Sequence, residues 1–185
     1  TLLKSSSLKQ GTDAISIADY QFSSNEEMLI VSTESESIYR HSTKANNLVY
    51  EIKTGKSFAV SKNGKQQYAT FSPTGEKIAF VRDNNIFLFD LKSQTEKQIT
   101  TDGKRNEIIN GATDWVYEEE LGCQDGFRWS PDGKNIAYWQ SDTKGVGTFY
   151  MINNVDSIYS KPIPLPYPKV GTANSAVKVG VISAK

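Results

Sequence analysis

Short runs of hydrophobic residues alternate with polar turns along this chain, and one such pattern occurs twice. Residues 71–80 read Phe-Ser-Pro-Thr-Gly-Glu-Lys-Ile-Ala-Phe, and residues 129–138 read Trp-Ser-Pro-Asp-Gly-Lys-Asn-Ile-Ala-Tyr. Pro presets φ for a turn and Gly accepts the left-handed conformation, so each copy predicts a strand, a tight turn and a second strand. A fainter copy begins at Phe22 and leads into the apolar run 28–31.

The spacing of these copies indicates a repeat fold. Their aromatic anchors, Phe22, Phe71 and Trp129, lie about 50 to 60 residues apart, which is typical of propeller blades. Residues 86–91 and 97–100 predict a third and a fourth strand after the second copy, and four strands complete a blade. The predicted fold class is therefore all-β, a β-propeller fragment of about three to four four-stranded blades with a short helical insertion.

The same pattern predicts how the chain is organised. We expect residues 1–185 to form part of one N-terminal propeller domain, cut from a longer propeller and left with open edges. Four prolines within 161–168 indicate an extended connector. The expected blade-like units are about 15–60, 65–100 and 125–160, with an acidic insertion at 101–124 and the start of the next blade at 170–185.

Composition narrows the function classes. The chain has 21 acidic and 21 basic side chains and no Lys/Arg runs, which argues against nucleic acid as a partner. No apolar run approaches the roughly 20 residues that span a bilayer, so no membrane span is expected. Cys123 is the only cysteine and His41 the only histidine. We therefore expect no internal disulfide, no zinc site and no cofactor.

The most unusual segment is Asp-Trp-Val-Tyr-Glu-Glu-Glu at 114–120. Thr113 or Asp114 can cap a short helix, and carboxylates near a helix N-terminus interact favourably with its dipole. Three adjacent carboxylates repel one another unless something cationic compensates them. Because neighbouring helical residues point about 100° apart, Glu119 and Glu120 could approach one small cation, such as an α-ammonium group, from two sides.

Two other interpretations of the cluster stay open. The glutamates could form a solvated helix face, or they could bind calcium, although the alternating ligand loop of calcium sites is missing. Arg40 likewise has two interpretations. It is either an exposed strand charge or a guanidinium that pairs with a carboxylate and donates to a substrate carbonyl.

Three motifs together resemble a known family. They are the segment 114–120, Tyr-Arg-His-Ser at 39–42, and Pro-Tyr-Pro-Lys at 166–169 followed by Gly171 and Asn174. They resemble the N-terminal propeller of dipeptidyl peptidase IV, a serine exopeptidase of the prolyl oligopeptidase clan. The likeness runs from about Asn25 to the end of the sequence.

The resemblance implies an eight-bladed propeller over an α/β-hydrolase domain with a Ser-Asp-His triad, which releases dipeptides with Pro or Ala at the second position. It implies that Glu119 and Glu120 hold the substrate α-ammonium and that Glu118 is structural. Arg40 would orient the peptide carbonyl and pair with a glutamate. By fixing the amine, the two carboxylates would place the second peptide bond at the nucleophile.

The sequence departs from the family pattern in two places. Leu121, Gly122 and Cys123 stand where many relatives carry an aromatic residue that lines the outer subsites. No Gly-x-Ser-x-Gly nucleophile motif occurs. We therefore expect the C-terminal α/β-hydrolase domain to lie outside this chain, and we expect no catalytic residue in the chain and no hydrolysis by it alone.

Two alternatives to this function are a non-catalytic peptide- or protein-binding propeller of the TolB type and a related peptidase with a different second-position preference. The resemblance further implies a periplasmic, extracellular or cell-surface location. It also implies that the partners are the N-terminus of a peptide substrate, the missing α/β-hydrolase domain and, for the full-length protein, a second copy in a homodimer.

Overall fold

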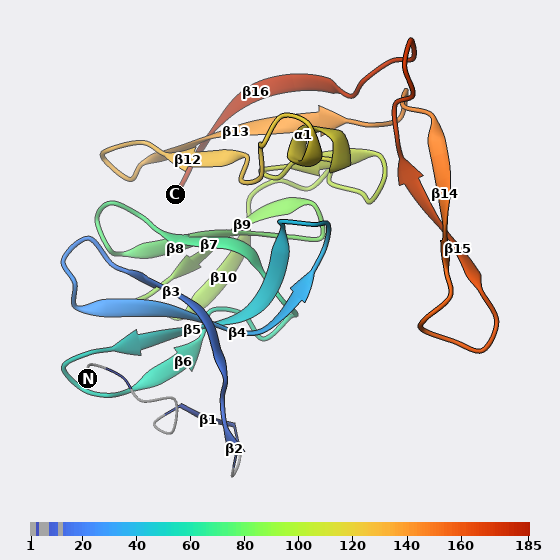
Figure 1. Ribbon diagram of the computed structural model, residues 1–185. Helices are drawn as coiled ribbons and strands as arrows, with labels where there is room; N and C mark the ends of the chain where they lie inside the picture. The colour runs from blue at the N-terminus through green and yellow to red at the C-terminus, as the bar shows by residue number, and fades with distance from the viewer. Residues whose placement is uncertain (1–2, 4–7, 11–12) are drawn as a thin grey trace.

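The first two sheets are built alike. A computed structural model describes residues 3, 8–10 and 13–185. In it, residues 17–98 form two antiparallel four-stranded sheets whose strands follow chain order, as in a propeller blade (Figure 1). The first sheet consists of β3 (Ile17–Phe22), β4 (Met28–Ser37), β5 (Thr43–Glu51) and β6 (Ser57–Ala59). The second consists of β7 (Gln67–Phe71), β8 (Lys77–Arg82), β9 (Asn85–Asp90) and β10 (Thr95–Gln98).

Both Ser-Pro-x-Gly segments are tight turns, as predicted. Gly75 and Gly133 have φ values of +71° and +69°, and each donates its N–H to a serine carbonyl three residues earlier at 2.9 Å. A side chain at this conformation would be strained, so the glycine fixes the turn that joins the two strands.

The third sheet is assembled from distant parts of the chain. Its central strand, β13 (Asn135–Asp142), pairs on one edge with β12 (Phe127–Trp129) and then β11 (Ile108–Asn110). Its other edge pairs over eight residues with β16 (Ala176–Ser183). Residues 176–183 therefore complete this sheet instead of opening the next blade, which differs from the division expected from the sequence. Local periodicity could not show this, because the pairing joins strands that are distant in sequence.

A separate hairpin takes the place of the expected connector. Among the described strands, β14 (Thr148–Asn153) and β15 (Lys161–Pro166) pair only with each other, and Figure 1 shows them projecting away from the stacked sheets. Pro162, Pro164 and Pro166 occupy alternate positions of β15. Tyr167, which follows Pro166 and points its N–H to the opposite side of the strand, donates this N–H to Gly147 O at 2.8 Å. The prolines thus lie where the backbone nitrogen points out of the ladder, and they do not prevent pairing.

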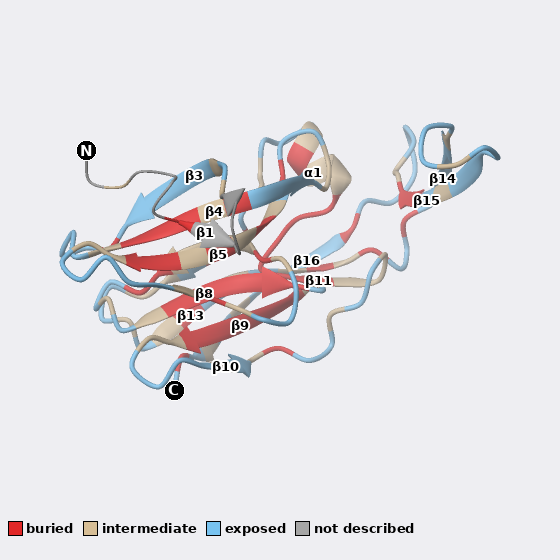
Figure 2. Ribbon diagram, turned by 90° about the horizontal axis from the view of Figure 1, so that it is seen from below, coloured by how far each residue is buried: buried red, intermediate tan, exposed pale blue. Residues whose placement is uncertain are grey.

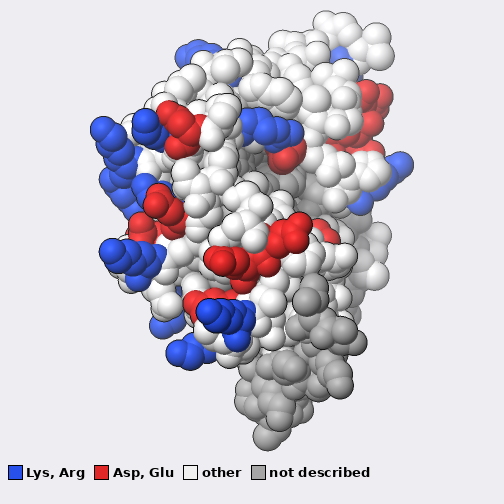
Figure 3. All heavy atoms as spheres, turned by 90° about the vertical axis from the view of Figure 1, so that its left-hand side faces the viewer, with Lys and Arg blue, Asp and Glu red and all other residues white. Residues whose placement is uncertain are grey.

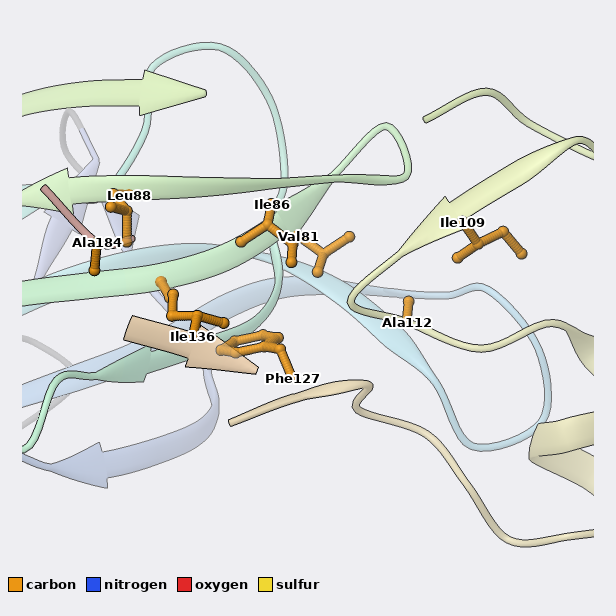
Figure 4. Close-up of a cluster of buried hydrophobic side chains, with 9 residues drawn as sticks. Val81, Ile86, Leu88, Ile109, Ala112, Phe127, Ile136 and Ala184 are labelled. Carbon is orange, nitrogen blue, oxygen red and sulfur yellow. The ribbon is translucent and has the colours of Figure 1, made fainter. Parts of the chain in front are cut away.

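The core lies between the sheets. The second sheet is the middle layer, and Figure 2 shows β8 and β9 buried along most of their length. This burial on both faces explains why their sequences are nearly continuous apolar runs. One cluster joins the second sheet to the third, as Figure 4 shows, and includes Val81, Ile86, Leu88, Ile109, Phe127 and Ile136. Another joins it to the first sheet and includes Ile30, Val49, Val60, Ile78, Phe80 and Phe87.

Two small elements complete the fold. The strands β1 (Lys9–Gln10) and β2 (Asp13–Ala14) form a two-stranded ribbon, and α1 (Trp115–Glu119) is a single short helix between β11 and β12. Strands therefore dominate the described residues, and the predicted all-β class with a helical insertion is confirmed. The stacking of antiparallel sheets places α1 at one end of the third sheet, beside the loop that joins β4 to β5 (Figure 1).

Candidate functional site

The helix α1 begins where the sequence predicts. Asp114 is the N-cap, and its Oδ1 accepts a hydrogen bond from the backbone N–H of Tyr117 at 3.0 Å. Its Oδ2 accepts a hydrogen bond from Ser175 Oγ, and both side chains are buried. Asp114 therefore also ties the start of the helix to the segment that leads into β16.

Glu118 fixes the other side of this helix. The residue is 1% exposed, and its Oε1 accepts hydrogen bonds from the backbone N–H groups of His41 at 2.8 Å and Ser42 at 3.0 Å. Its Oε2 and Ser42 Oγ are buried, and neither has a hydrogen-bond partner among the residues that the structure describes. Hydrogen bonds to a charged acceptor are stronger than neutral ones, so Glu118 clamps the β4–β5 loop onto α1.

The clamp brings Arg40 to the acidic cluster. Arg40 Nε lies 3.3 Å from Glu119 Oε2, and the two side chains are 74% and 10% exposed, respectively. Of the two interpretations of Arg40, the structure therefore shows the carboxylate pair. Because the guanidinium is so exposed, its remaining N–H groups stay open to solvent, and a ligand carbonyl could accept from them.

Glu119 and Glu120 border two adjacent cavities. The first has a volume of about 960 Å³, and its lining includes Glu119, Arg40 and Tyr39. The second has a volume of about 850 Å³, and its lining includes Glu120. Trp115 lines both cavities. The two glutamates therefore line different cavities, and Trp115 is a wall that both cavities share.

Two tyrosines, Tyr39 and Tyr68, lie near the buried carboxylates of Asp114 and Glu118. Burial, together with the Asp114 and Glu118 carboxylates, raises the pKa of Tyr39 to about 12. Burial and the Glu118 carboxylate also raise the pKa of Tyr68 well above its ordinary value. Both phenols are thus protonated at neutral pH and remain hydrogen-bond donors.

Several residues of the site were not identified as such from the sequence. Phe149 lines the second cavity, and Ser175 and Tyr68 contact or face the buried carboxylates. No local signal marks them, because each reaches α1 from a distant strand or segment. Tyr167 belongs to the Pro-Tyr-Pro-Lys motif, and its ring packs on Trp115 with centroids 4.8 Å apart.

The charges on the left-hand side of the molecule, as Figure 1 draws it, are mixed. On the face shown in Figure 3, Lys and Arg side chains are interspersed with Asp and Glu side chains, without a broad field of one sign. In the described part of the chain, no three His, Cys, Asp or Glu side chains group as metal ligands. Nor does any helix among residues 3, 8–10 and 13–185 have the length and apolarity to cross a bilayer.

Face-to-face antiparallel sheets, two of which are four-stranded meanders, with an acidic helical insertion at one end, define a segment of a β-propeller. The model of the dipeptidyl peptidase IV (DPP IV) N-terminal region matches residues 23–185. The chain belongs to this family, and its propeller is of the dipeptidyl peptidase type.

Individual relatives agree with this assignment. The chain is 31% identical to prolyl endopeptidase FAP of Bos taurus, over 100% of this chain and 24% of that protein. It is 40% identical to a probable dipeptidyl peptidase 4 of Aspergillus clavatus, over 78% of this chain and 20% of that protein. The crystal structure of Porphyromonas gingivalis dipeptidyl peptidase 4 superposes with a TM-score of 0.90 at 36% identity, covering 100% of this chain and 27% of that one. The chain thus spans about a quarter of the length of these relatives.

Proposed function

We propose that this chain is the amine-recognition part of a dipeptidyl peptidase, in which Glu119 and Glu120 hold the α-ammonium group of a peptide's free N-terminus. The observation that carries this proposal is the pairing of Arg40 with Glu119 on a helix that two buried carboxylates hold in place. Such anchoring preorganises the charged groups, so less ordering entropy is lost when a ligand binds.

The chemistry of the site suits a peptide N-terminus. An ammonium group offers three donors, and two carboxylates accept them as charge-assisted hydrogen bonds. The exposed guanidinium of Arg40 then donates to the carbonyl of the first or second residue. Holding the amine at a fixed place sets the distance to the second peptide bond, so the site measures the length of the released dipeptide.

Hydrolysis itself is assigned to another part of the full-length protein. We propose that an α/β-hydrolase domain carries the nucleophile and releases Xaa-Pro or Xaa-Ala dipeptides without a cofactor, and that the 185-residue chain alone is inactive. A periplasmic, extracellular or cell-surface location suits an enzyme that meets free peptide N-termini.

The hairpin β14–β15 supports the proposal that the full-length protein forms a homodimer. Its exposed apolar side chains include Tyr150, Ile152, Val155, Ile158 and Tyr159, whose exposed fractions range from 60% to 98%. Exposed apolar surface of this extent on a projecting arm is typical of an interaction site, and we assign it to contact between two copies.

The test is hydrolysis of chromogenic Gly-Pro substrates, with free and acetylated N-termini, by the full-length protein that contains this chain. The Glu119→Gln/Glu120→Gln variant should lower kcat/KM for the free-amine substrate by at least about a hundredfold, because two hydrogen bonds to charged groups are weakened. The matched control is Glu26→Gln/Glu27→Gln, an adjacent pair of exposed glutamates in the β3–β4 turn. It should leave kcat/KM unchanged.

Two outcomes would contradict the proposal. Equal cleavage of free and acetylated substrates would show that the amine is not recognised. Absence of hydrolysis in the full-length protein would favour the non-catalytic, peptide- or protein-binding propeller instead.

A further inference from the structure

The hairpin β4–β5, which carries Arg40 at its tip, is held at two points. At the end of the tip, Glu118 accepts hydrogen bonds from the backbone N–H groups of His41 and Ser42. Before the tip, strand β4 is held by Lys65, a residue that the proposed function leaves unused. The side chain of Arg40 is itself 74% exposed, so the position of its guanidinium depends on how firmly the backbone on either side is held.

Strand β4 is irregular just before it reaches the tip. Its pairing with β5 shifts between Thr33 and Glu36, where two residues of β4 stand opposite one residue of β5. Glu34, at the start of this bulge, has a φ of +49°, a conformation that residues other than glycine seldom adopt. A bulge bends its strand and changes the direction of the residues beyond it. The direction of the tip, and of Arg40 on it, therefore depends on this bulge.

Lys65 contacts both sides of the bulge. Its Nζ donates hydrogen bonds to Glu34 O at 2.5 Å and to Glu36 Oε1 at 2.6 Å. Lys44 Nζ lies 3.2 Å from the other carboxylate oxygen of Glu36, and hydrogen bonds from Lys65 and Lys44 lower the pKa of Glu36. The side chain of Lys65 is only 19% exposed, so this ammonium group is shielded from solvent better than that of an ordinary surface lysine.

The backbone at Lys65 is itself firmly held. The next residue, Gln66, is 2% exposed and exchanges two backbone hydrogen bonds of 2.9 and 3.0 Å with Ala45 of β5. Its Oε1 also accepts a hydrogen bond from the backbone N–H of Asn47 at 3.1 Å. The ammonium group of Lys65 thus reaches β4 from a backbone that is fixed to β5.

We infer that Lys65 is a positioning residue for the reaction: by holding the bulge of β4, it keeps the guanidinium of Arg40 beside Glu119 and directed at the peptide carbonyl. This inference rests on the proposed function and adds a residue to it. Lys65 and Glu36 line the first cavity together with Arg40 and Glu119, so a shift of the bulge would change the shape of the cavity at the site itself. Lys65 acts through Arg40 and has no contact with the reacting groups of the substrate.

The experiment is a double-mutant cycle between Lys65→Met and Arg40→Ala in the full-length protein that contains this chain, with kcat/KM for chromogenic Gly-Pro as the readout. Lys65→Met should lower kcat/KM about tenfold, because a small misplacement of a positioned group can cost up to about a hundredfold. In the Arg40→Ala background the same change should cost less than about twofold. Lys65→Arg, which keeps the charge, should recover part of the loss in the wild-type background.

A second readout does not depend on activity. Amide hydrogen exchange of residues 37–42, measured by mass spectrometry on the same proteins, should be about fivefold faster or more in Lys65→Met, because the segment loses one of its two points of attachment. The matched control is Lys62→Met. Lys62 lies in the same loop, is exposed and forms no ion pair in the part of the chain that the structure describes. This variant should leave both kcat/KM and the exchange unchanged.

The outcomes separate the two proposals. An equal loss of kcat/KM in both backgrounds would mean that Lys65 contributes only to stability, and the positioning role would be wrong. Unchanged exchange of residues 37–42, or an equally large effect of Lys62→Met, would also overturn it. Equal cleavage of free and acetylated Gly-Pro would instead overturn the amine site. The cycle would then still decide whether Lys65 acts through Arg40, because it compares variants on one substrate.

Discussion

The strongest prediction concerns Glu118, the buried carboxylate that clamps the β4–β5 loop onto α1. We compare Glu118→Ala, which removes the acceptor, with Glu118→Gln, which retains an oxygen of similar position but removes the charge. In the wild-type protein Oε1 accepts two backbone N–H groups, from His41 at 2.8 Å and Ser42 at 3.0 Å.

The magnitude follows from these contacts. A hydrogen bond to a charged group contributes about 1.5 kcal/mol or more, so Glu118→Ala should lower the free energy of unfolding by about 3 kcal/mol. Glu118→Gln should cost about 1 kcal/mol or less, because the amide oxygen still accepts both N–H groups and the buried charge is removed. Glu120→Ala is the control. Glu120 is exposed on the same turn, so the change should stay within about 0.5 kcal/mol.

The assay is urea unfolding of the 185-residue chain, followed by tryptophan fluorescence, with Trp115 reporting on the helix. The reasoning would be refuted by equal losses in the two Glu118 variants, which would mean that the charge and not the acceptor oxygen matters. A loss below about 1 kcal/mol in Glu118→Ala would show that the loop is held by other contacts.

Three further predictions use the same unfolding assay. Arg82 forms an ion pair with Glu96, with side chains 10% and 15% exposed, so Arg82→Met should cost about 3 kcal/mol. Burial opposes ionisation of Glu96, but the hydrogen bonds from Arg82 and Ser61 outweigh burial and lower the pKa of Glu96. The wild-type protein should therefore lose stability as the pH falls below about 4.5. An equally steep loss in Arg82→Met would contradict this prediction. Because the pKa of Tyr39 is raised to about 12, the contribution of Tyr39 to the free energy of unfolding should be present below about pH 10 and be lost between about pH 10 and 12. Tyr39→Phe should flatten this decline in stability. An unchanged decline would exclude Tyr39 as its source. Gly111→Ala should cost about 2 kcal/mol, since φ is +72° and a Cβ would lie 2.8 Å from Ile86 Cγ1; a neutral effect would show that the backbone relaxes there.

The sequence predicts the fold where the signals are local. Pro73 and Gly75 specify a turn within a few residues, so the strands on either side could be placed in advance. The pairing of β16 with β13 has no such signal, because it joins residues 176–183 to residues 135–142. The prolines of β15 were misleading, since proline prevents pairing only where its nitrogen faces the partner strand.

In the candidate site, too, the sequence predicts the features that have a local signal and misses those that depend on distant contacts. The helix start was predictable because Asp114 caps it through Tyr117, only three residues away. The sequence could not decide between the two interpretations of Arg40. The contact with Glu119 depends on the β4–β5 loop lying beside α1, and these segments are far apart in the sequence. Phe149 could not be assigned at all, since its position depends on how the hairpin leaves the third sheet.

The arrangement of the three glutamates explains how adjacent carboxylates are tolerated. On a helix, neighbours differ by about 100°, so Glu118, Glu119 and Glu120 point in three directions and meet three environments. Glu118 points inward to backbone N–H groups, Glu119 pairs with Arg40, and Glu120 remains exposed at the second cavity. Two of the three charges thus have partners within the chain, and Glu120 has no ion-pair partner among the described residues. An incoming ammonium group would give the third carboxylate, that of Glu120, a partner of opposite charge. Binding of a cation at Glu120 should therefore relieve repulsion among the carboxylates as well as form new hydrogen bonds.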